Sequence, residues 1–308
     1  MTLALLLSGQ GGQHPGMFDL TAGHPDAQPI FAAAKPLLAG VDPRDLARNG
    51  TDALHENRTG QILCCVAALA GWRALGTFGT VRTIVAGYSI GDLAAWGIAG
   101  WFEPHDVLAL AARRAEAMDA ASGAGFGLAG VRGLGLDALE ALAVAHGCHL
   151  AIRNAADSGV VGGAREALEL LCGAARSRGA QRAVVLPVHT PSHTPLLAAA
   201  TETFREALRQ TTSRRPPPGA PRLLSGLDGA VVFRGEDGLA KLATQISHSI
   251  DWAACLEACR EYGADQVLEL GPGHALATMA RSALPGARVH ALDEFRTLEG
   301  VRDWLSRL

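Results

Sequence analysis

The sequence predicts an α/β protein with a mostly parallel sheet and a small ferredoxin-like insert. Short strand-like apolar runs alternate with longer helix-like runs, an order typical of parallel sheets covered by helices. A Gly-Tyr-Ser-Ile-Gly turn at residues 87–91 joins one such strand to a helix. Between residues 123 and 188 the pattern becomes strand, helix, two strands, helix, strand, which indicates the insert.

The composition excludes several classes of protein. With 308 residues, 48% of them hydrophobic and 19% charged, the chain is too apolar to be intrinsically disordered. The formal net charge is −3, and Lys and Arg form no run longer than a pair. We therefore expect no nucleic-acid or membrane partner. The apolar run at residues 3–7 is far shorter than the roughly 20 residues of a spanning helix and lacks the basic flank of a signal peptide, so we expect a soluble, cytoplasmic protein.

The cysteines indicate neither a metal site nor a disulfide framework, because their spacing contains no paired C-x-x-C knuckles. Most of them lie in apolar, Ala-rich runs, which predicts buried free thiols. The six are Cys64, Cys65, Cys148, Cys172, Cys255 and Cys259.

The elements of the first 122 residues follow from apolar runs and helix propensity. Residues 3–7 and 81–86 are predicted strands, and residues 61–75, 92–100 and 106–121 are predicted helices. A Gly-rich stretch at 122–135 then marks the change to the insert.

The insert is predicted to contain four strands and two helices. The strands are 128–132, 149–153, 159–163 and 183–186, and the helices are 136–146 and 164–178. The chain is expected to return to the main sheet through residues 223–225 and 266–270. Residues 214–221, with four prolines, are expected to be an exposed connection.

The turn at residues 87–91 indicates a nucleophile elbow, because it follows a strand and precedes a helix. Ser89 would project its hydroxyl from this turn, and the N–H of Ile90, at the helix N-terminus, can donate to an oxyanion. The alternative is a structural serine in a tight turn.

A serine nucleophile needs a base, and His193 is the candidate because its loop, Val-His-Thr-Pro-Ser-His-Thr-Pro, follows a strand and is fixed by two prolines. The alternatives are a solvated loop histidine at this position, or His189 as the base, although His189 is nearer the strand and more typical of a structural residue. The Gly-rich loop at residues 8–13 can supply a second oxyanion amide or cradle a phosphate, but it lacks the ending of a P-loop and a full G-x-G-x-x-G.

Five segments, in order along nearly the whole chain, together resemble the malonyl-CoA:acyl-carrier-protein transacylase family. Residues 9–13 resemble its G-Q-G-[SA]-Q loop, residues 87–92 its G-H-S-x-G-E elbow and residues 114–118 its R-x-x-x-M helix segment. Residues 191–193 resemble the loop with its catalytic histidine, and residues 269–273 resemble its E-x-G-P-G turn.

The resemblance implies a large α/β-hydrolase-like catalytic domain of residues 1–122 and 189–308, with residues 123–188 as the ferredoxin-like subdomain. It implies that Ser89 is the acylated nucleophile and His193 its general base and acid. Backbone amides of Gln10 and Ile90 would form the oxyanion hole. Arg114 would bind the malonyl carboxylate in a bidentate fork and reject neutral acyl groups; without the resemblance, Arg114 would be read as a solvated charge.

The resemblance also implies a main-chain carbonyl at Gln245 that orients the histidine, and Tyr88 and Asn154 as possible pocket residues. The substrate would be malonyl-CoA, with no permanently bound cofactor and no metal. The reaction would be ping-pong transfer through a malonyl-serine ester to the thiol of an acyl-carrier protein.

Three positions depart from the family pattern: Tyr88 stands where His is usual, Asp92 where Glu is usual, and Ser8 where Pro is usual. The Gly-Tyr-Ser elbow is more similar to that of the transacylase (epsilon) subunit of bacterial malonate decarboxylase. That similarity implies a carrier subunit with a phosphoribosyl-dephospho-CoA arm as the partner.

Three other functions stay open from the sequence. The first is a malonyl-CoA transacylase of fatty-acid or polyketide synthesis, with the same chemistry and a phosphopantetheine carrier. The second is a serine esterase or thioesterase, in which His274 or His290 near the C-terminus would be the base. The third is a non-catalytic scaffold that docks a carrier.

Overall fold

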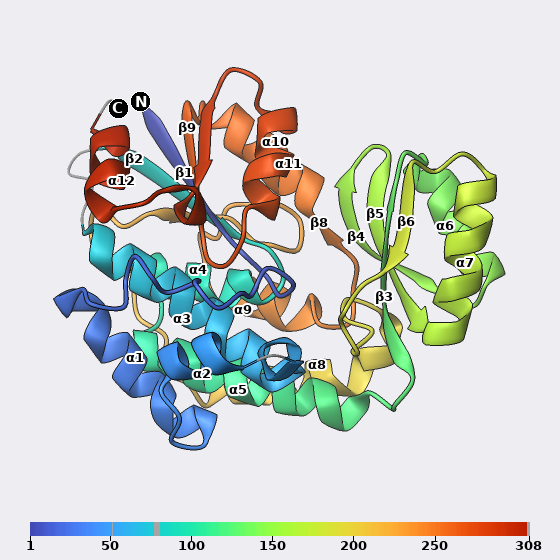
Figure 1. Cartoon of the computed structure of the whole chain (residues 1–308), viewed down its shortest axis with the longest axis horizontal. Coiled ribbons are helices and arrows are strands. Elements are labelled where there is room, and N and C mark those ends of the chain that lie inside the picture. Colours follow the sequence, from blue (N-terminus) through green and yellow to red (C-terminus); the bar gives the residue numbers. More distant parts are fainter. Residues whose placement is uncertain (51, 77–80, 307–308) are drawn as a thin grey trace.

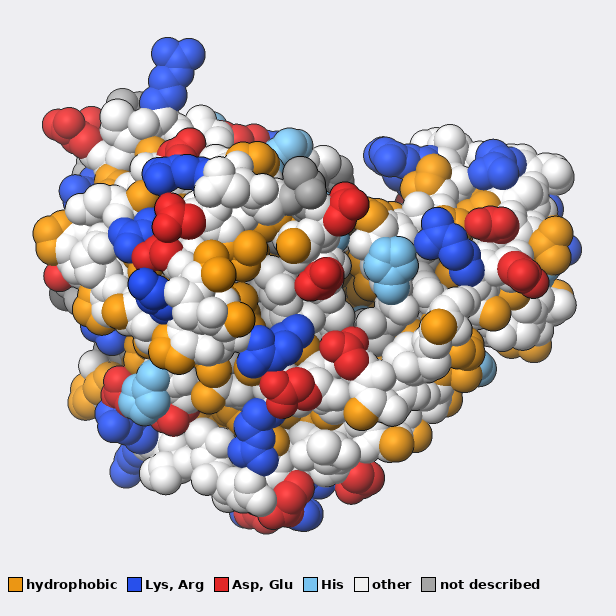
Figure 2. All heavy atoms as spheres, turned by 60° about the horizontal axis from the view of Figure 1, so that its bottom comes forward, with side chains coloured by type: hydrophobic (Ala, Val, Ile, Leu, Met, Phe, Trp, Pro, Cys, Tyr) orange, Lys and Arg blue, Asp and Glu red, His pale blue; other side chains and the backbone are white. Residues whose placement is uncertain are grey.

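The computed structural model describes residues 1–50, 52–76 and 81–306. These residues form two sheets of five strands each, one central in the larger body of the molecule and one in the smaller body (Figure 1). The space-filling view of another face shows a hollow between the two bodies (Figure 2).

The larger sheet is parallel throughout, with the strand order β10-β9-β1-β2-β7. Its central strand, β1, is buried at all six positions because helices cover both faces, as in doubly covered parallel sheets. The strands are β1 (Thr2–Leu7), β2 (Arg82–Gly87), β7 (Arg222–Leu223), β9 (Gln266–Leu270) and β10 (Arg288–Ala291).

The two faces of this sheet pack into different cores. Leu3, Leu5 and Leu7 of β1 join the larger core with the long helices, whereas Ala4 and Leu6 point to the opposite face. The helices of the first core are α1 (Gln28–Ala34), α2 (Pro43–Asn49), α3 (Asn57–Leu75), α4 (Ile90–Ile98), α5 (Pro104–Ala121), α8 (Ala198–Arg209), α9 (Gly235–Thr244) and α12 (Leu298–Leu305).

The second core lies between the two sheets. It is built from α10 (Trp252–Glu261) and α11 (Ala275–Ala283) together with one face of the smaller sheet. Short 3₁₀ segments complete the helices; they are η1 (Pro25–Ala27), η2 (Lys35–Leu38), η3 (Asp52–His55), η4 (Pro195–Leu197) and η5 (Leu292–Glu294).

The smaller sheet has the order β6-β3-β5-β4-β8. The first four strands in this order are antiparallel to one another, and α6 (Leu136–Ala145) and α7 (Arg165–Ser177) cover one face with a core of their own. The strands are β3 (Phe126–Arg132), β4 (His149–Ala155), β5 (Ser158–Ala164), β6 (Arg182–Val185) and β8 (Ile250–Asp251). The open face points to the larger body, which places the space for a site between the sheets.

The order of elements predicted for the insert is confirmed, with bounds that differ by up to two residues. Two details differ from expectation. Asn154 lies within β4 rather than between two strands, since β4 continues to Ala155. The fifth strand, β8, comes from far outside the insert and pairs in parallel with β4. The division into two folding domains, 1–122 with 189–308 and 123–188, stays a prediction.

The predicted free thiols are confirmed: all six cysteines are buried and unpaired. In the described ranges, the structure has no helix both long and apolar enough to span a membrane and no cluster of His, Cys, Asp and Glu suited to a metal ion.

Candidate active site

The turn at 87–91 has the strained geometry of a nucleophile elbow. It links β2 to α4, and Ser89 has φ 56° and ψ −117°, a conformation that non-glycine residues rarely adopt. Glycine is required on both sides of it: a Cβ on Gly87 would lie 2.1 Å from the nitrogen of Asp92, and one on Gly91 would lie 2.1 Å from the carbonyl oxygen of Leu7. The close packing of β1, β2 and α4 therefore holds Ser89 in this conformation.

Ser89 and His193 meet although 104 positions separate them in the sequence. Nε2 of His193 lies 2.7 Å from Oγ of Ser89, and Nδ1 lies 2.5 Å from the carbonyl oxygen of Gln245. A carbonyl only accepts, so the proton of the neutral ring is on Nδ1 and the lone pair of Nε2 faces the serine hydroxyl. The backbone N–H of His193 donates to the carbonyl of Ile246, which anchors the loop.

Burial holds His193 in its neutral form. Desolvation is the main cause, with the nearby positive charge of Arg114 second, and together they lower the pKa of His193 to about 3 against the opposing bond to Gln245. The imidazole is therefore ready to take a proton from Ser89 near neutral pH.

Asp92 supports this arrangement from the first turn of α4. Its Oδ2 accepts hydrogen bonds from the side-chain amide of Gln245 at 2.8 Å and from the N–H of Gly226 at 3.1 Å. The side chain of Gln245 is thus fixed by Asp92 while its carbonyl accepts from His193. Burial raises the pKa of Asp92 to about 7. The sequence identified Asp92 only as a departure from the family motif. An acidic residue in an otherwise apolar helix does, however, indicate a buried carboxylate with hydrogen-bond partners.

The two predicted oxyanion donors lie on the elbow and on the loop after β1. Ile90 begins α4, so its N–H has no acceptor within the helix, and Gln10 lies on the loop after β1. Neither backbone N–H donates to a protein acceptor within the described part of the chain. This loop runs close to the elbow, since a Cβ on Gly9 would lie 2.8 Å from the carbonyl oxygen of Tyr88.

Arg114 is a buried cation without a carboxylate ion pair in the part of the chain that the structure describes. Its side chain is 1% exposed. Nη1 donates to Oε1 of Gln61 at 2.7 Å, while Nη2 is buried without a hydrogen-bond partner. Burial lowers its pKa to about 10, so the side chain is still charged at pH 7. The sequence pattern had not identified Gln61, which holds the guanidinium through a contact between α3 and α5.

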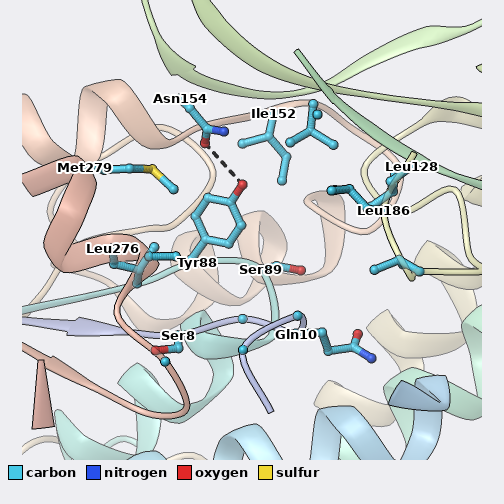
Figure 3. A pocket seen from close by; sticks show the side chains of 18 of the residues that line it. Ser8, Gln10, Tyr88, Ser89, Leu128, Ile152, Asn154, Leu186, Leu276 and Met279 are labelled. Atoms are coloured by element: carbon cyan, nitrogen blue, oxygen red, sulfur yellow. Dashed lines mark hydrogen bonds between the residues drawn. The ribbon is translucent and has the colours of Figure 1, made fainter. Parts of the chain in front are cut away.

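A cavity of about 460 Å³ opens beside the serine and lies within the usual size range of ligand pockets. Figure 3 shows Tyr88, Ser89 and the loop at Ser8 and Gln10 on one side, with Leu128, Ile152, Asn154 and Leu186 on the other. His193 also lines it, whereas Arg114, Ile90 and Gln245 lie outside the lining. The structure therefore brings the predicted residues to one region but places three of them behind the cavity surface.

Tyr88 spans the two bodies of the molecule. Its hydroxyl donates to Oδ1 of Asn154 at 3.1 Å, as Figure 3 shows, and its ring meets Trp252 edge-on, with 5.3 Å between centroids. Burial raises the pKa of Tyr88 well above its usual value, so it stays a neutral donor. The residue beside the nucleophile thus connects the elbow to β4.

We expect Tyr88→Phe to lower the free energy of unfolding by about 0.5–1.5 kcal/mol, the net value of one hydrogen bond. Urea denaturation followed by fluorescence would measure it. Tyr262→Phe is the matched control, because the hydroxyl of Tyr262 makes no hydrogen bond to described residues while its ring packs on Arg222. Equal unfolding free energies for the two variants would contradict a stabilising Tyr88–Asn154 contact.

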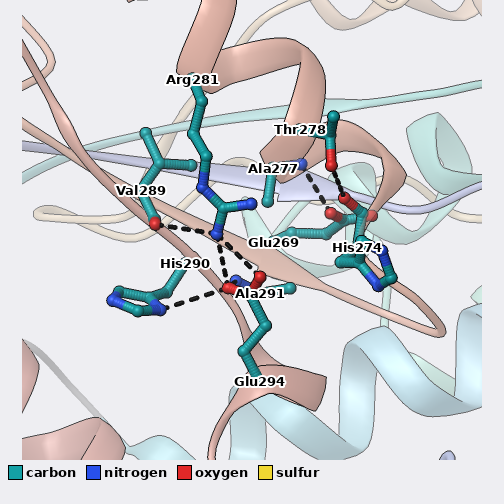
Figure 4. A network of polar contacts seen from close by, with 9 residues as sticks. All are labelled: Glu269, His274, Ala277, Thr278, Arg281, Val289, His290, Ala291 and Glu294. Atoms are coloured by element: carbon teal, nitrogen blue, oxygen red, sulfur yellow. Dashed lines mark hydrogen bonds and ion pairs between the residues drawn. The ribbon is translucent and has the colours of Figure 1, made fainter. Parts of the chain in front are cut away.

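The end of β9 and the turn after it line the cavity next to the loop after β1. Glu269 is fully buried and accepts from Oγ of Ser8 at 2.8 Å and from the N–H of Ala277 at 2.7 Å, and burial raises its pKa to about 7. Figure 4 shows the neighbouring network, in which Arg281 and Glu294 form an ion pair at 2.6 Å. Ser8, which stands at the usual proline position, therefore ties the loop after β1 to β9.

Within the described residues, neither of the histidines weighed for a hydrolase bonds to Ser89. His290 faces Glu294, with Nδ1 3.2 Å from Oε2, and His274 lines the cavity without a bond to Ser89 (Figure 4). His189 is exposed. His193 is the histidine that bonds to Ser89.

Residues 5–225 match the family model described as acyl transferase domain. The chain is 32% identical to the malonyl CoA-acyl carrier protein transacylase of Mycobacterium tuberculosis, over 94% of this chain and 96% of that one. It is 27% identical to the malonyl CoA-acyl carrier protein transacylase of Escherichia coli, over 94% of this chain and 96% of that one. The crystal structure of the acyl-carrier-protein S-malonyltransferase of Burkholderia pseudomallei superposes with a TM-score of 0.89 at 28% identity, over 98% of this chain and all of that one. The fold is therefore the α/β fold with a parallel sheet seen in these acyltransferases.

Proposed function

Because this chain belongs to the acyl transferase domain family, we propose that it transfers a malonyl group from malonyl-CoA to the thiol of an acyl carrier protein. The relatives named for that reaction match nearly the whole chain. The serine and histidine in contact at the cavity supply the groups that such a transfer needs.

The transfer proceeds in two halves. The neutral Nε2 of His193 takes the proton of Ser89 as its oxygen attacks the thioester carbonyl, and the N–H groups of Gln10 and Ile90 hold the developing oxyanion. The carbon–sulfur bond breaks, and the leaving CoA thiolate takes the proton from His193. The carrier thiol then gives its proton to His193, attacks the malonyl ester and releases Ser89 by the reverse route.

Arg114 is the observation that supports malonyl as the acyl group. A guanidinium buried to 1% exposure, with Nη2 unpartnered, lacks an anion, and burying such a charge is costly unless it is paired. The malonyl ester carries a carboxylate only three carbons from the serine oxygen. If this carboxylate reached Nη2 of Arg114 from the cavity, it would be the anionic partner that the guanidinium lacks.

For the carrier, the relatives favour an acyl carrier protein with a phosphopantetheine arm, as in fatty-acid or polyketide synthesis, because they are named as malonyl CoA-acyl carrier protein transacylases. The carrier subunit of malonate decarboxylase is the second candidate. It is favoured by Tyr88, which occupies the position beside the nucleophile and contacts Asn154.

Intact-protein mass spectrometry tests both parts of this proposal. We expect malonyl-CoA to give a malonyl adduct much faster than acetyl-CoA gives an acetyl adduct. The isolated malonyl-enzyme is then offered a phosphopantetheine carrier and, separately, a carrier with a phosphoribosyl-dephospho-CoA arm, and the faster loss of the adduct identifies the acceptor. Steady release of CoA without an adduct would instead indicate a hydrolase.

The pH dependence should reflect the low pKa of His193. A base must be neutral, and a pKa of about 3 keeps His193 neutral at pH 5 and above. We therefore expect kcat/KM for malonyl-CoA, which reports the free enzyme, to show no acidic limb from His193 near the usual histidine pKa of about 6.5. Rates are measured from pH 8 down to pH 5 in the wild type and in the variants Asp92→Asn and Glu269→Gln, because burial raises the pKa of both carboxyls to about 7. A limb centred near 6.5 that persists in both variants would show that His193 is not held neutral.

A further inference from the structure

Two arginines face the same cavity from neighbouring strands. Arg132 of β3 and Arg182 of β6 are paired directly in the antiparallel register, and both line the cavity. Residues paired in this way project from the same face of a sheet about 5 Å apart, where like charges are destabilising. Both side chains are exposed, and within the described residues neither forms an ion pair, whereas Arg153 on β4 pairs with Glu140.

A hydroxyl extends this row on the other side. Ser158 of β5 is paired with Arg132 in the register and also lines the cavity. Three strands thus present two guanidinium groups and one hydroxyl side by side. The guanidinium groups can only donate hydrogen bonds, and the hydroxyl can also donate one. Guanidinium groups in particular are well suited to the oxygens of a phosphate.

The row lies at the far end of an apolar wall that starts beside the catalytic pair. Leu128 marks the near end: a Cβ on Gly162, its partner in the register, would lie 2.6 Å from the methyl group of Thr194, the residue after His193. Arg132 lies four residues further along β3, which is about 13 Å at the usual rise of a strand.

The side chains between the two ends are apolar. Figure 3 shows Leu128, Leu186 and Ile152 on the sheet side of the cavity, facing the elbow at Ser89. Val160 and Val184 continue this lining along β5 and β6. A substrate whose thioester carbonyl lies at Ser89 would therefore extend its arm along a mostly apolar wall toward Arg132 and Arg182.

We propose that Arg132 and Arg182, with Ser158, bind the phosphate at the end of the pantetheine arm while the arm lies along this apolar wall. This inference rests on the proposed function. The phosphate attached directly to pantetheine is common to CoA and to a phosphopantetheine carrier, so one site serves both halves of the transfer. Arg132 and Arg182 thus select substrates by the phosphate and leave the chemistry at Ser89 unchanged.

Calorimetric binding of three thiols to the unacylated protein tests the site without requiring acyl transfer. The thiols are CoA, phosphopantetheine and pantetheine, which lacks the phosphate. In the double variant Arg132→Gln/Arg182→Gln we expect the Kd for CoA and for phosphopantetheine to rise roughly tenfold, as two partly exposed charge contacts would give. The Kd for pantetheine should not change.

The matched control is Arg165→Gln/Arg178→Gln, which removes the same charge from α7 and its C-terminal end, on the other face of the same sheet. It should leave all three affinities unchanged. A loss for CoA alone would place the contact on another phosphate of CoA and overturn the proposal, as would equal losses for all three thiols or no loss at all.

Kinetics then separate this site from the proposed function. With malonyl-CoA we expect the double variant to raise KM while kcat stays the same, and added salt should weaken binding less in the variant than in the wild type. If the wild type forms no malonyl adduct, the proposed function fails, whereas the contrast in thiol binding still decides the phosphate site.

Discussion

Replacing Ser89 with alanine should abolish the malonyl adduct and lower the rate of malonyl transfer by roughly 10⁴- to 10⁶-fold. Removing a nucleophile that acts as a unit with its base leaves only binding and oxyanion stabilisation, and losses of about this size are typical. The bond between Ser89 and His193, at 2.7 Å, is the contact that the variant removes. Intact mass after mixing with malonyl-CoA and single-turnover transfer to a carrier would measure the two effects.

Ser177→Ala is the control for this variant, because its hydroxyl lies on α7 and, among the described residues, bonds only to the carbonyl of Gly173. It should form the malonyl adduct at the wild-type rate. Thermal unfolding and near-UV circular dichroism of Ser89→Ala would show whether the fold is kept, since Ser89 is held in a strained conformation. A folded Ser89→Ala protein that still gained the mass of a malonyl group would place the nucleophile on another residue.

The sequence predicted best those features that are encoded within a few consecutive residues. The elbow depends on Gly87 and Gly91, whose missing side chains allow contacts that no other residue permits. The strand before it and the helix after it are contiguous with it. Burial of β1 at every position follows in the same way from an uninterrupted apolar run.

Contacts between distant segments were less accessible to sequence reasoning. Asn154 and Tyr88, separated by 66 positions, meet only because β4 lies opposite the elbow. The pairing of β8 with β4 rests on two residues, too few for a periodic pattern. Gln245 was identified through a resemblance, and its bond to Asp92 could not be seen because it depends on how α4 and α9 pack.

Arg113 and Arg114 show most clearly that burial of a charged residue cannot be predicted from its local sequence. Arg113 and Arg114 are adjacent and chemically identical in sequence, yet Arg113 is exposed and bonds to Gln210 while Arg114 is 1% exposed. Consecutive residues of a helix point in different directions, so the two arginines lie on different sides of α5. Which side is buried depends on α3 and α8, which pack against this helix. Helical periodicity alone leaves the orientation of α5 open.

Arg114→Gln should convert a selective site into a less selective one. We expect malonylation by malonyl-CoA to slow by roughly 30- to 4000-fold, which corresponds to about 2–5 kcal/mol for truncating one partner of a buried charge pair. The neutral amide no longer requires an anion, so acetyl-CoA should acylate Ser89 faster than it does in the wild type. The ratio of malonyl to acetyl adduct, followed by mass spectrometry over time, measures the change.

Arg113→Gln is the natural control, since it removes the neighbouring charge from the exposed side of the same helix. It should leave the ratio of malonyl to acetyl adduct at its wild-type value. Arg114 also lowers the pKa of His193, so Arg114→Gln should make that histidine easier to protonate, and any rate loss through this route would grow as the pH falls. The selectivity change should instead be present at pH 8, where His193 is neutral in both proteins. If both acyl groups slowed equally at pH 8, Arg114 would be acting on the histidine or the fold, and the malonyl carboxylate would need another partner.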